Sequence, residues 1–120
     1  MNENEIPAKT LENAAATLRN NAKAAKEATI NRFKSEALVF EQGQHWKRAA
    51  IRWEHCSRLV EDNEERGLFF YSAFFCYRRA DDILKAAAMI KQCRAEYLLT
   101  GDKMTVAFCN AEMEALNAST

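Results

Sequence analysis

The residues of this chain that could act in acid–base or nucleophilic chemistry are few, and their spacing does not group them. His45 and His55 are ten residues apart on one predicted helix, which places them about 80° apart around its axis. Neither has a serine, cysteine or carboxylate at a spacing typical of a nucleophile and its base. The acidic pairs Glu64-Glu65 and Asp81-Asp82 stand where helices are expected to start, and there they favour the helix dipole. Because a glycine-rich phosphate loop is also lacking, we expect no catalysis and no cofactor.

Metal binding and disulfide formation are likewise disfavoured by the positions of the cysteines. Cys56, Cys76, Cys93 and Cys109 occur singly, without a CxxC or CxxH pair. A structural zinc site needs ligands grouped in pairs, and His45, His55 and Cys56 do not supply that spacing. The sequence therefore predicts buried free thiols, with a metal or disulfide role as the alternative.

Composition favours one water-soluble domain. The 120 residues include 48% hydrophobic and 28% charged residues, with 17 Lys plus Arg against 17 Asp plus Glu. Nucleic-acid affinity depends largely on neutralising phosphates, so this balance makes direct nucleic-acid binding the third choice of function. The start of the chain does not resemble a signal peptide, and no apolar run suggests a membrane span. We expect a cytoplasmic protein that does not engage a membrane.

Only three glycines and one proline interrupt the chain, which favours long helices. We expect a flexible N-terminus over residues 1–9 and a single all-α domain over residues 10–120. Apolar residues recur at helical spacing throughout, and no strand pattern competes. They predict about six helices. The first starts from an N-cap at Thr10, the second runs from about Thr29 to Gln42, and the third carries Trp46 to Val60. The fourth, capped by Asn63 or Asp62, carries Leu68 to Tyr77, and the fifth carries Ile83 to Tyr97. After a turn at Thr100-Gly101-Asp102, the last carries Met104 to Ala115. Gly43 is expected to take the left-handed conformation that ends the second helix.

Two of these helices have distinctive compositions. The first carries Leu11, Ala14, Leu18, Ala22 and Ala25 on one side, a stripe so rich in alanine that it buries little area. We expect it to be the least firmly packed helix, either a dimer contact or a mobile arm. The helix that carries Leu68 to Tyr77 is apolar almost all round, which predicts the central element of the fold. Its phenylalanines are too many for one face, so some could form a partner surface.

The chain also repeats itself with a shift of 37 residues. The series Trp46, Ala49, Ala50, Trp53 and Cys56 falls on Ile83, Ala86, Ala87, Ile90 and Cys93. Paired alanines between large residues let two antiparallel helices approach closely. The repeat therefore predicts two related hairpins, at about 29–62 and 64–99, stacked with a C-terminal helix and leaving an outer surface for recognition.

The first hairpin resembles a tetratricopeptide repeat. The run from Glu41 to Ala49 is similar to that family's turn, with Trp53 and Cys56 at its later aromatic and small positions. It has one extra residue after Gly43 and lacks the closing proline. The resemblance implies a chaperone or adaptor that binds a peptide or a secreted partner, which is the second choice of function.

The stretch from Phe33 to Cys76 resembles the ANR family, small negative regulators of AraC-type activators in bacteria. The residues that carry the likeness are Ala37, Glu41, Trp46, Ala49, Ala50, Trp53, Phe75 and Cys76. Ser72 and Leu68 depart from the arginine and tryptophan expected there. The resemblance implies a regulator without enzymatic chemistry that contacts a transcription factor or a nucleoid protein and alters virulence or plasmid gene expression.

Candidate contact residues come from the basic clusters and the large aromatics. Arg48 and Arg52 are neighbours on one predicted helix and repel each other unless an anion or an acidic partner lies between them. Core packing is the default for the tryptophans, and a solvated face is the default for the arginines, but both residue types are common at interfaces. The residues chosen for protein binding are Arg48, Arg52, Arg78, Arg79, Trp46 and Phe70.

Overall fold

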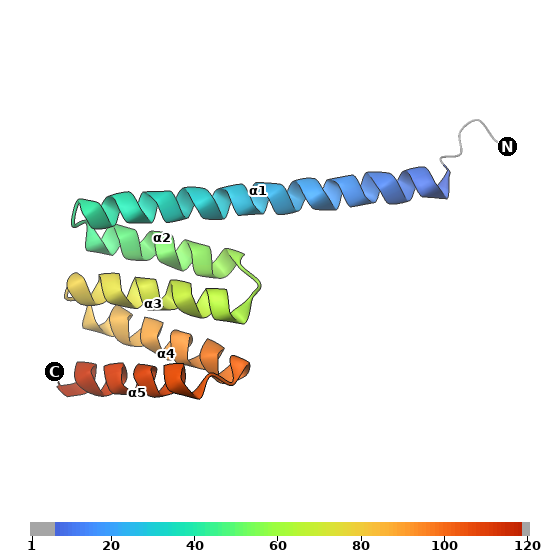
Figure 1. Ribbon diagram of the computed structural model, residues 1–120. Helices are drawn as coiled ribbons and strands as arrows, with labels where there is room; N and C mark the ends of the chain where they lie inside the picture. The colour runs from blue at the N-terminus through green and yellow to red at the C-terminus, as the bar shows by residue number, and fades with distance from the viewer. Residues whose placement is uncertain (1–6, 119–120) are drawn as a thin grey trace.

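The computed structural model describes residues 7–118, and these residues form five α-helices with no strand among them. The helices are α1 (Ala8–Gln42), α2 (Trp46–Leu59), α3 (Asn63–Arg79), α4 (Ile83–Thr100) and α5 (Lys103–Ala118). Each packs mainly on the helix that precedes or follows it, and successive helices run in opposite directions (Figure 1). The all-α prediction is thus confirmed. No helix within residues 7–118 is long and apolar enough to cross a membrane.

The prediction of six helices was wrong, because the first two form one helix of 35 residues. Nothing in the sequence breaks it between residues 10 and 29: no glycine or proline occurs there, and the Thr29 hydroxyl donates back to the Ala25 carbonyl within the helix. Thr10 is not the N-cap, since the helix begins at Ala8 after Pro7. Of the expected flexible segment, residues 1–6 lie outside the described residues, and Ala8 and Lys9 are helical.

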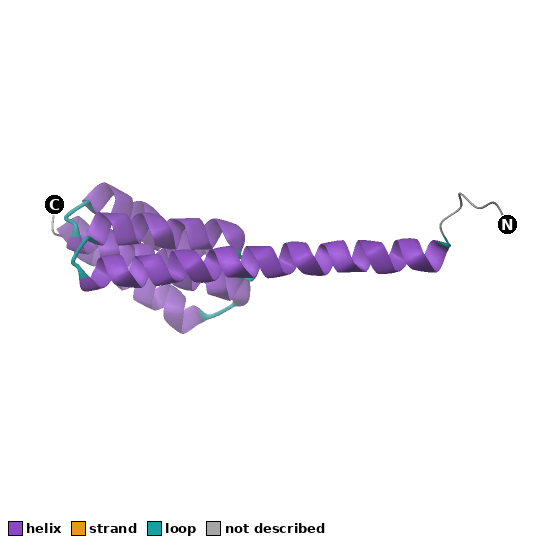
Figure 2. Ribbon diagram, turned by 90° about the horizontal axis from the view of Figure 1, so that it is seen from above, coloured by secondary structure: helices purple, strands orange, loops and turns teal. Residues whose placement is uncertain are grey.

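The first part of α1 projects well beyond the other four helices (Figures 1 and 2). Within residues 7–118, the first ion pair from α1 to another part of the chain is that of Lys26 with Glu61, in the connection between α2 and α3, at 3.3 Å, and the first buried residue is Ile30. We call residues 8–25 the arm. Its leucines, Leu11 and Leu18, are 54% and 69% exposed, so the expectation of a loosely packed first helix is confirmed.

The core is centred on α3, as its composition predicted. This helix packs on both α2 and α4, and it buries Phe69 and Phe74 while Phe70 and Phe75 remain half-buried. Trp53 of α2 stacks on Phe69 with ring centroids 5.9 Å apart. Two neighbours on opposite sides of α3 therefore account for its nearly continuous apolar circumference.

Three of the four turns share one hydrogen-bonded geometry. A residue one or two positions beyond each helix end adopts a left-handed conformation, at Gln44 (φ 61°), Asp81 (φ 59°) and Gly101 (φ 77°). The following amide then donates to the carbonyl five residues back, as in His45 to Phe40 at 2.8 Å and Asp82 to Tyr77 at 2.9 Å. This is the Schellman arrangement. Gly43 itself has φ −83°, so its expected left-handed conformation was wrong by one residue.

Several of the residues matched by the 37-residue shift have similar environments, although Ala50 is fully buried and its counterpart Ala87 is only partly buried. Ala49 and Ala86 are both fully buried, and so are Cys56 and, to within 2%, Cys93. Trp53 and Ile90 are buried at equivalent places in α2 and α4, and the turns before these two helices have matching dihedral angles. Small buried residues at the same places let α2 and α4 each approach the preceding helix closely.

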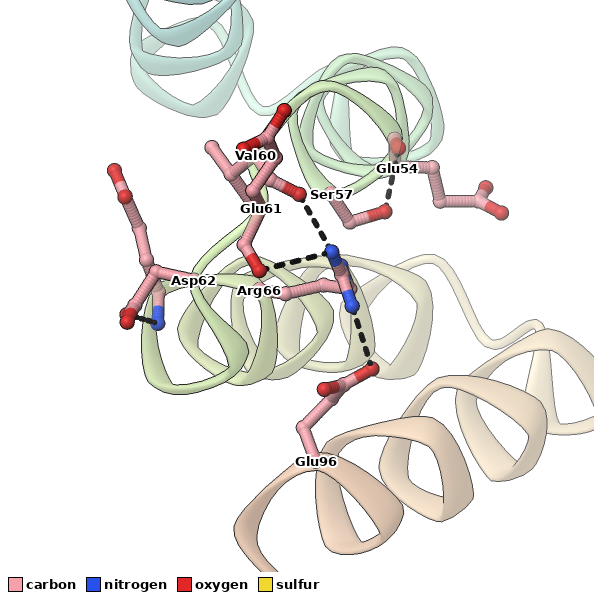
Figure 3. A network of polar contacts seen from close by, with 8 residues as sticks. Glu54, Ser57, Val60, Glu61, Asp62, Arg66 and Glu96 are labelled. Carbon is pink, nitrogen blue, oxygen red and sulfur yellow. Dashed lines mark hydrogen bonds and ion pairs between the residues drawn. The ribbon is translucent and has the colours of Figure 1, made fainter. Parts of the chain in front are cut away.

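An arginine joins α3 to the two segments beside it (Figure 3). Arg66 donates to the carbonyls of Val60 at 2.7 Å and Glu61 at 3.3 Å, in the connection between α2 and α3. It also pairs with Glu96 of α4 at 3.4 Å. Asp62, one of the two residues expected to cap this helix, does so by accepting from the Glu65 amide at 2.9 Å. Arg66 therefore satisfies carbonyls that the irregular connection leaves unpaired.

Candidate protein-binding surface

We call α2–α5, together with the part of α1 that packs on them, the helix array. Three side chains from α2 and α3 form an aromatic and cationic cluster at one end of this array. The antiparallel packing brings Trp46, at the start of α2, beside Phe75 and Arg79, near the end of α3. The rings of Trp46 and Phe75 meet edge-on with centroids 6.1 Å apart. The Arg79 guanidinium carbon lies 5.2 Å from the Trp46 ring and 4.9 Å from the Phe75 ring. Such stacking holds a guanidinium in place without neutralising its charge.

Arg79 keeps its charge available to an external anion. The side chain is exposed, and within residues 7–118 no carboxylate forms an ion pair with it. Trp46 and Phe75 are half-buried, so part of each ring remains exposed. Partly exposed aromatic rings beside a fixed cation are a common composition for a protein-contact site.

The cluster continues along α3 as a stripe on one face of that helix. Leu68, Ser72, Phe75 and Arg79 follow one another at spacings of four, three and four residues, so they share one side. We call these four residues the α3 stripe. Leu68 is 53% exposed, and the Ser72 hydroxyl donates to the Leu68 carbonyl at 3.1 Å. The α3 stripe thus presents apolar surface at one end and apolar surface with a cation at the other.

Helix α5 reaches across to α3 beside this stripe. Arg78 forms an ion pair with Glu112 at 2.8 Å, and the Tyr71 and Phe108 rings lie 5.7 Å apart. Phe108 remains 44% exposed, so the apolar surface extends from α3 onto α5. These two contacts position α5 against α3 although α4 separates them in the chain.

The structure brings together only some of the residues predicted to bind a partner. Trp46 and Arg79 meet in the cluster, whereas Arg78 is engaged with Glu112 and Phe70 is half-buried without a ring contact to another residue of the described chain. Arg48 is exposed but stands about 160° round α2 from Trp46. It therefore faces away from the cluster.

Arg52 has an internal role in the structure. Its guanidinium pairs with Glu36 of α1 and lies 5.6 Å from the Phe40 ring and 6.0 Å from the Phe33 ring. The repulsion expected between Arg48 and Arg52 is relieved by this glutamate of the same chain. Arg52 thus fastens α2 to α1.

Phe75 and Leu68 are the surface residues that sequence reasoning did not choose. Phe75 is one of four phenylalanines within residues 69–75, and hydrophobicity alone does not tell which of them the neighbouring helices cover. The available signal was the spacing from Leu68 to Arg79, which places an arginine on the same side as two apolar residues. That pattern is atypical of a core-facing side.

The four cysteines are buried free thiols, as predicted. Burial raises the pKa of Cys56 to about 11 and that of Cys76 to about 12, because the thiolate would be desolvated. Cys93 and Cys109 contact each other across α4 and α5, with their sulfurs 3.7 Å apart. These pKa shifts are opposite to those of a reactive cysteine. Across residues 7–118, no group of three His, Cys, Asp or Glu side chains is placed to hold a metal ion.

A cleft of about 710 Å³ opens where the arm leaves the array. Ile30, Leu59 and Val60 form its apolar part, and charged residues of both signs surround it. Two of these, Lys26 and Glu61, already pair with each other. Because its charges are mixed and partly paired, we regard the cleft as a weaker candidate than the α3 stripe.

Comparison with known proteins gives no further assignment. No protein-family model matches the chain, and neither the curated proteins nor the solved structures include a significant match.

Proposed function

We propose that this chain is a small non-catalytic regulatory protein that binds a transcription factor or a nucleoid-associated protein and thereby modulates gene expression. The observation that supports protein binding most strongly is the Arg79 guanidinium held against Trp46 and Phe75 without an ion-pair partner in residues 7–118. The class of partner comes from the resemblance of residues 33–76 to ANR regulators. Binding then acts by changing the partner's activity.

The chemistry of the surface defines what the partner must present. Leu68 and Phe75 favour one or two apolar side chains, and Arg79 favours a carboxylate beside them. An amphipathic helix with an acidic residue at one end of its apolar face meets both requirements. The α3 stripe covers three helical turns, a length that suits such a helix.

The test compares partner capture by variants of the full chain. Leu68→Glu combined with Arg79→Glu changes two exposed positions of the stripe, and we expect it to lose the DNA-binding proteins that the natural chain retains from its host. Lys91→Glu, at an exposed position of α4, is the matched control and should retain them. Equal retention by all three proteins would refute the proposal.

A tetratricopeptide-like adaptor is the second candidate, and the repeated turn geometry favours it. Gln44 and Asp81, which are 37 residues apart, have φ angles of 61° and 59°, and the helices that follow bury matching alanines. We infer from this that α1–α2 and α3–α4 are related hairpins that stack and could receive a peptide. Binding to extended peptides on an array, unaffected by Arg79→Glu, would favour this function over the first.

Direct nucleic-acid binding remains the third proposal. Ion pairs within the chain disfavour it, because they neutralise arginines that would otherwise bind phosphates. Carboxylates of the chain pair with Arg32, Arg52, Arg58, Arg66 and Arg78. Affinity that falls steeply with salt would be its signature, because phosphate binding releases counterions.

A further inference from the structure

The arm carries an apolar seam that the rest of the described chain leaves uncovered. Leu11, Ala15, Leu18, Ala22 and Ala25 are separated by four, three, four and three residues, the alternation of a two-stranded coiled coil. Residues 8–25 project beyond the other helices (Figure 2), and almost all of them are exposed. In the seven-residue repeat, Leu11, Leu18 and Ala25 take the d positions, and Ala15 and Ala22 take the a positions.

From this pattern we propose that two copies of the chain pair through their arms as an antiparallel two-helix coiled coil. In an antiparallel pair, each d residue faces an a residue of the other helix. Leu18 then faces Ala22 of the second copy, and Ala15 faces Ala25 of the second copy. Leu11 faces Thr29, the next a position, at the base of the other arm. Each leucine is thereby matched with a small residue, which keeps the distance between the helices even.

Charge pairing supports the same register. The positions that flank this seam at e are Glu12, Arg19 and Lys26. The antiparallel pairing places Glu12 beside Lys26 of the second copy, and the two-fold symmetry forms this opposite-charge contact twice. Arg19 lies beside its own symmetry mate at the centre, the one unfavourable contact of the set. Lys26 also forms an ion pair with Glu61 of its own chain, but that pair is exposed and therefore weak.

A parallel pair fits the residues less well. It would place Leu11 and Leu18 each against its own copy and would alternate these wide layers with narrow alanine layers. Glu12 would face Pro7, and Lys26 would face Asn21, so no opposite charges would meet. A parallel pair would also bring the two helix arrays to the same end. The antiparallel pair separates them to opposite ends of the joined arms.

The test is the association state of the full chain, measured by sedimentation equilibrium from micromolar to millimolar concentration. The natural chain should form dimers. Leu18→Lys should raise the dissociation constant of the dimer at least about a hundredfold, because it removes a leucine from both halves of the seam. Asn20→Lys, which adds the same charge on the outer side of the arm, is the control and should dimerise as the natural chain does. Thermal unfolding of each variant establishes that the core remains folded.

Charge exchange distinguishes the two orientations. Glu12→Lys should weaken the dimer about tenfold, and adding Lys26→Glu to it should restore the dimer, because the opposite charges meet again. Arg19→Gln should tighten the dimer by removing the central repulsion. A natural chain that stays monomeric throughout, or a Leu18→Lys variant that dimerises normally, would overturn the proposal. Failure of the double exchange to restore the dimer would overturn the antiparallel orientation.

Discussion

The Tyr97 ring of α4 occupies the space into which a side chain at Gly67 of α3 would project. A Cβ atom at Gly67 would lie 2.6 Å from Tyr97 Cε2 and 3.0 Å from Tyr97 Cδ2. Tyr97 is itself buried, and its hydroxyl donates to the Glu64 carbonyl at 3.4 Å. The close packing of α3 on α4 at this point thus depends on the absence of a side chain at Gly67.

Gly67→Ala should therefore destabilise the protein by about 1–3 kcal/mol, since the tyrosine ring and a helix backbone must move apart. In a helix interior without such a neighbour, the same change would stabilise by roughly 0.5–1 kcal/mol, because alanine is the better helix former. The sign of the change in the free energy of unfolding, measured by urea denaturation, shows whether the Tyr97 ring or the helix propensity of alanine dominates. A gain in stability would contradict the close packing of α3 on α4.

Arg66→Met should cost about 1–3 kcal/mol, because Glu96 loses its cation and the Val60 and Glu61 carbonyls lose their donor. Glu96 is only 12% exposed, so its charge would be poorly solvated. Adding Glu96→Leu should recover part of the loss in chemical denaturation. A double variant no more stable than Arg66→Met would show that the Arg66–Glu96 pair in Figure 3 contributes little.

Arg52→Ala and Arg48→Ala should behave differently although both residues lie on α2. Arg52→Ala removes the pairing with Glu36 and the packing on Phe33 and Phe40, so the free energy of unfolding should fall by about 1–2 kcal/mol. Arg48→Ala changes an exposed side chain and should stay within about 0.5 kcal/mol of the natural chain. Equal thermal midpoints for the two variants would show that Arg52 does not fasten α2 to α1.

The buried thiols should make the protein less stable at alkaline pH. The pKa of Cys56 and Cys76 rises from 9.0 to about 11 and about 12 on folding. The folded state therefore keeps protons that the unfolded chain releases. Their stabilising contribution is complete below pH 9.0 and is lost as the pH rises towards these folded values. Cys56→Ala and Cys76→Ala should each reduce this slope, measured by urea unfolding at a series of pH values. An unchanged slope would contradict the assignment.

The sequence predicted those parts of the fold that depend on local patterns. The turn at Thr100-Gly101-Asp102, the cap at Asp62 and the central place of α3 all follow from residue types and periodicity, and the structure contains each of them. The continuity of α1 was missed because an alanine-rich stripe buries too little area to indicate whether a helix is packed or free. In that part of the chain, intrinsic helix propensity alone determines the structure, and it favours one continuous helix.

The candidate surface could be predicted only in part, because exposure depends on which helices become neighbours. Trp46 and Arg79 were identified as residue types common at interfaces, and their meeting required the antiparallel placement of α2 beside α3. Arg52 was assigned to the surface because Glu36, its partner, is 16 residues away on another helix. Long-range pairs of this kind leave no periodic signal in one sequence.

The most direct test of protein binding by the α3 stripe follows the fluorescence of Trp46. Trp53→Phe leaves Trp46 as the one tryptophan of the chain, and its half-buried ring is open to a water-soluble quencher such as acrylamide. A saturating amount of a partner captured through Leu68 and Arg79 should lower the acrylamide quenching constant of Trp46. An unchanged constant in a sample where binding is shown independently would contradict the placement of the partner on this surface.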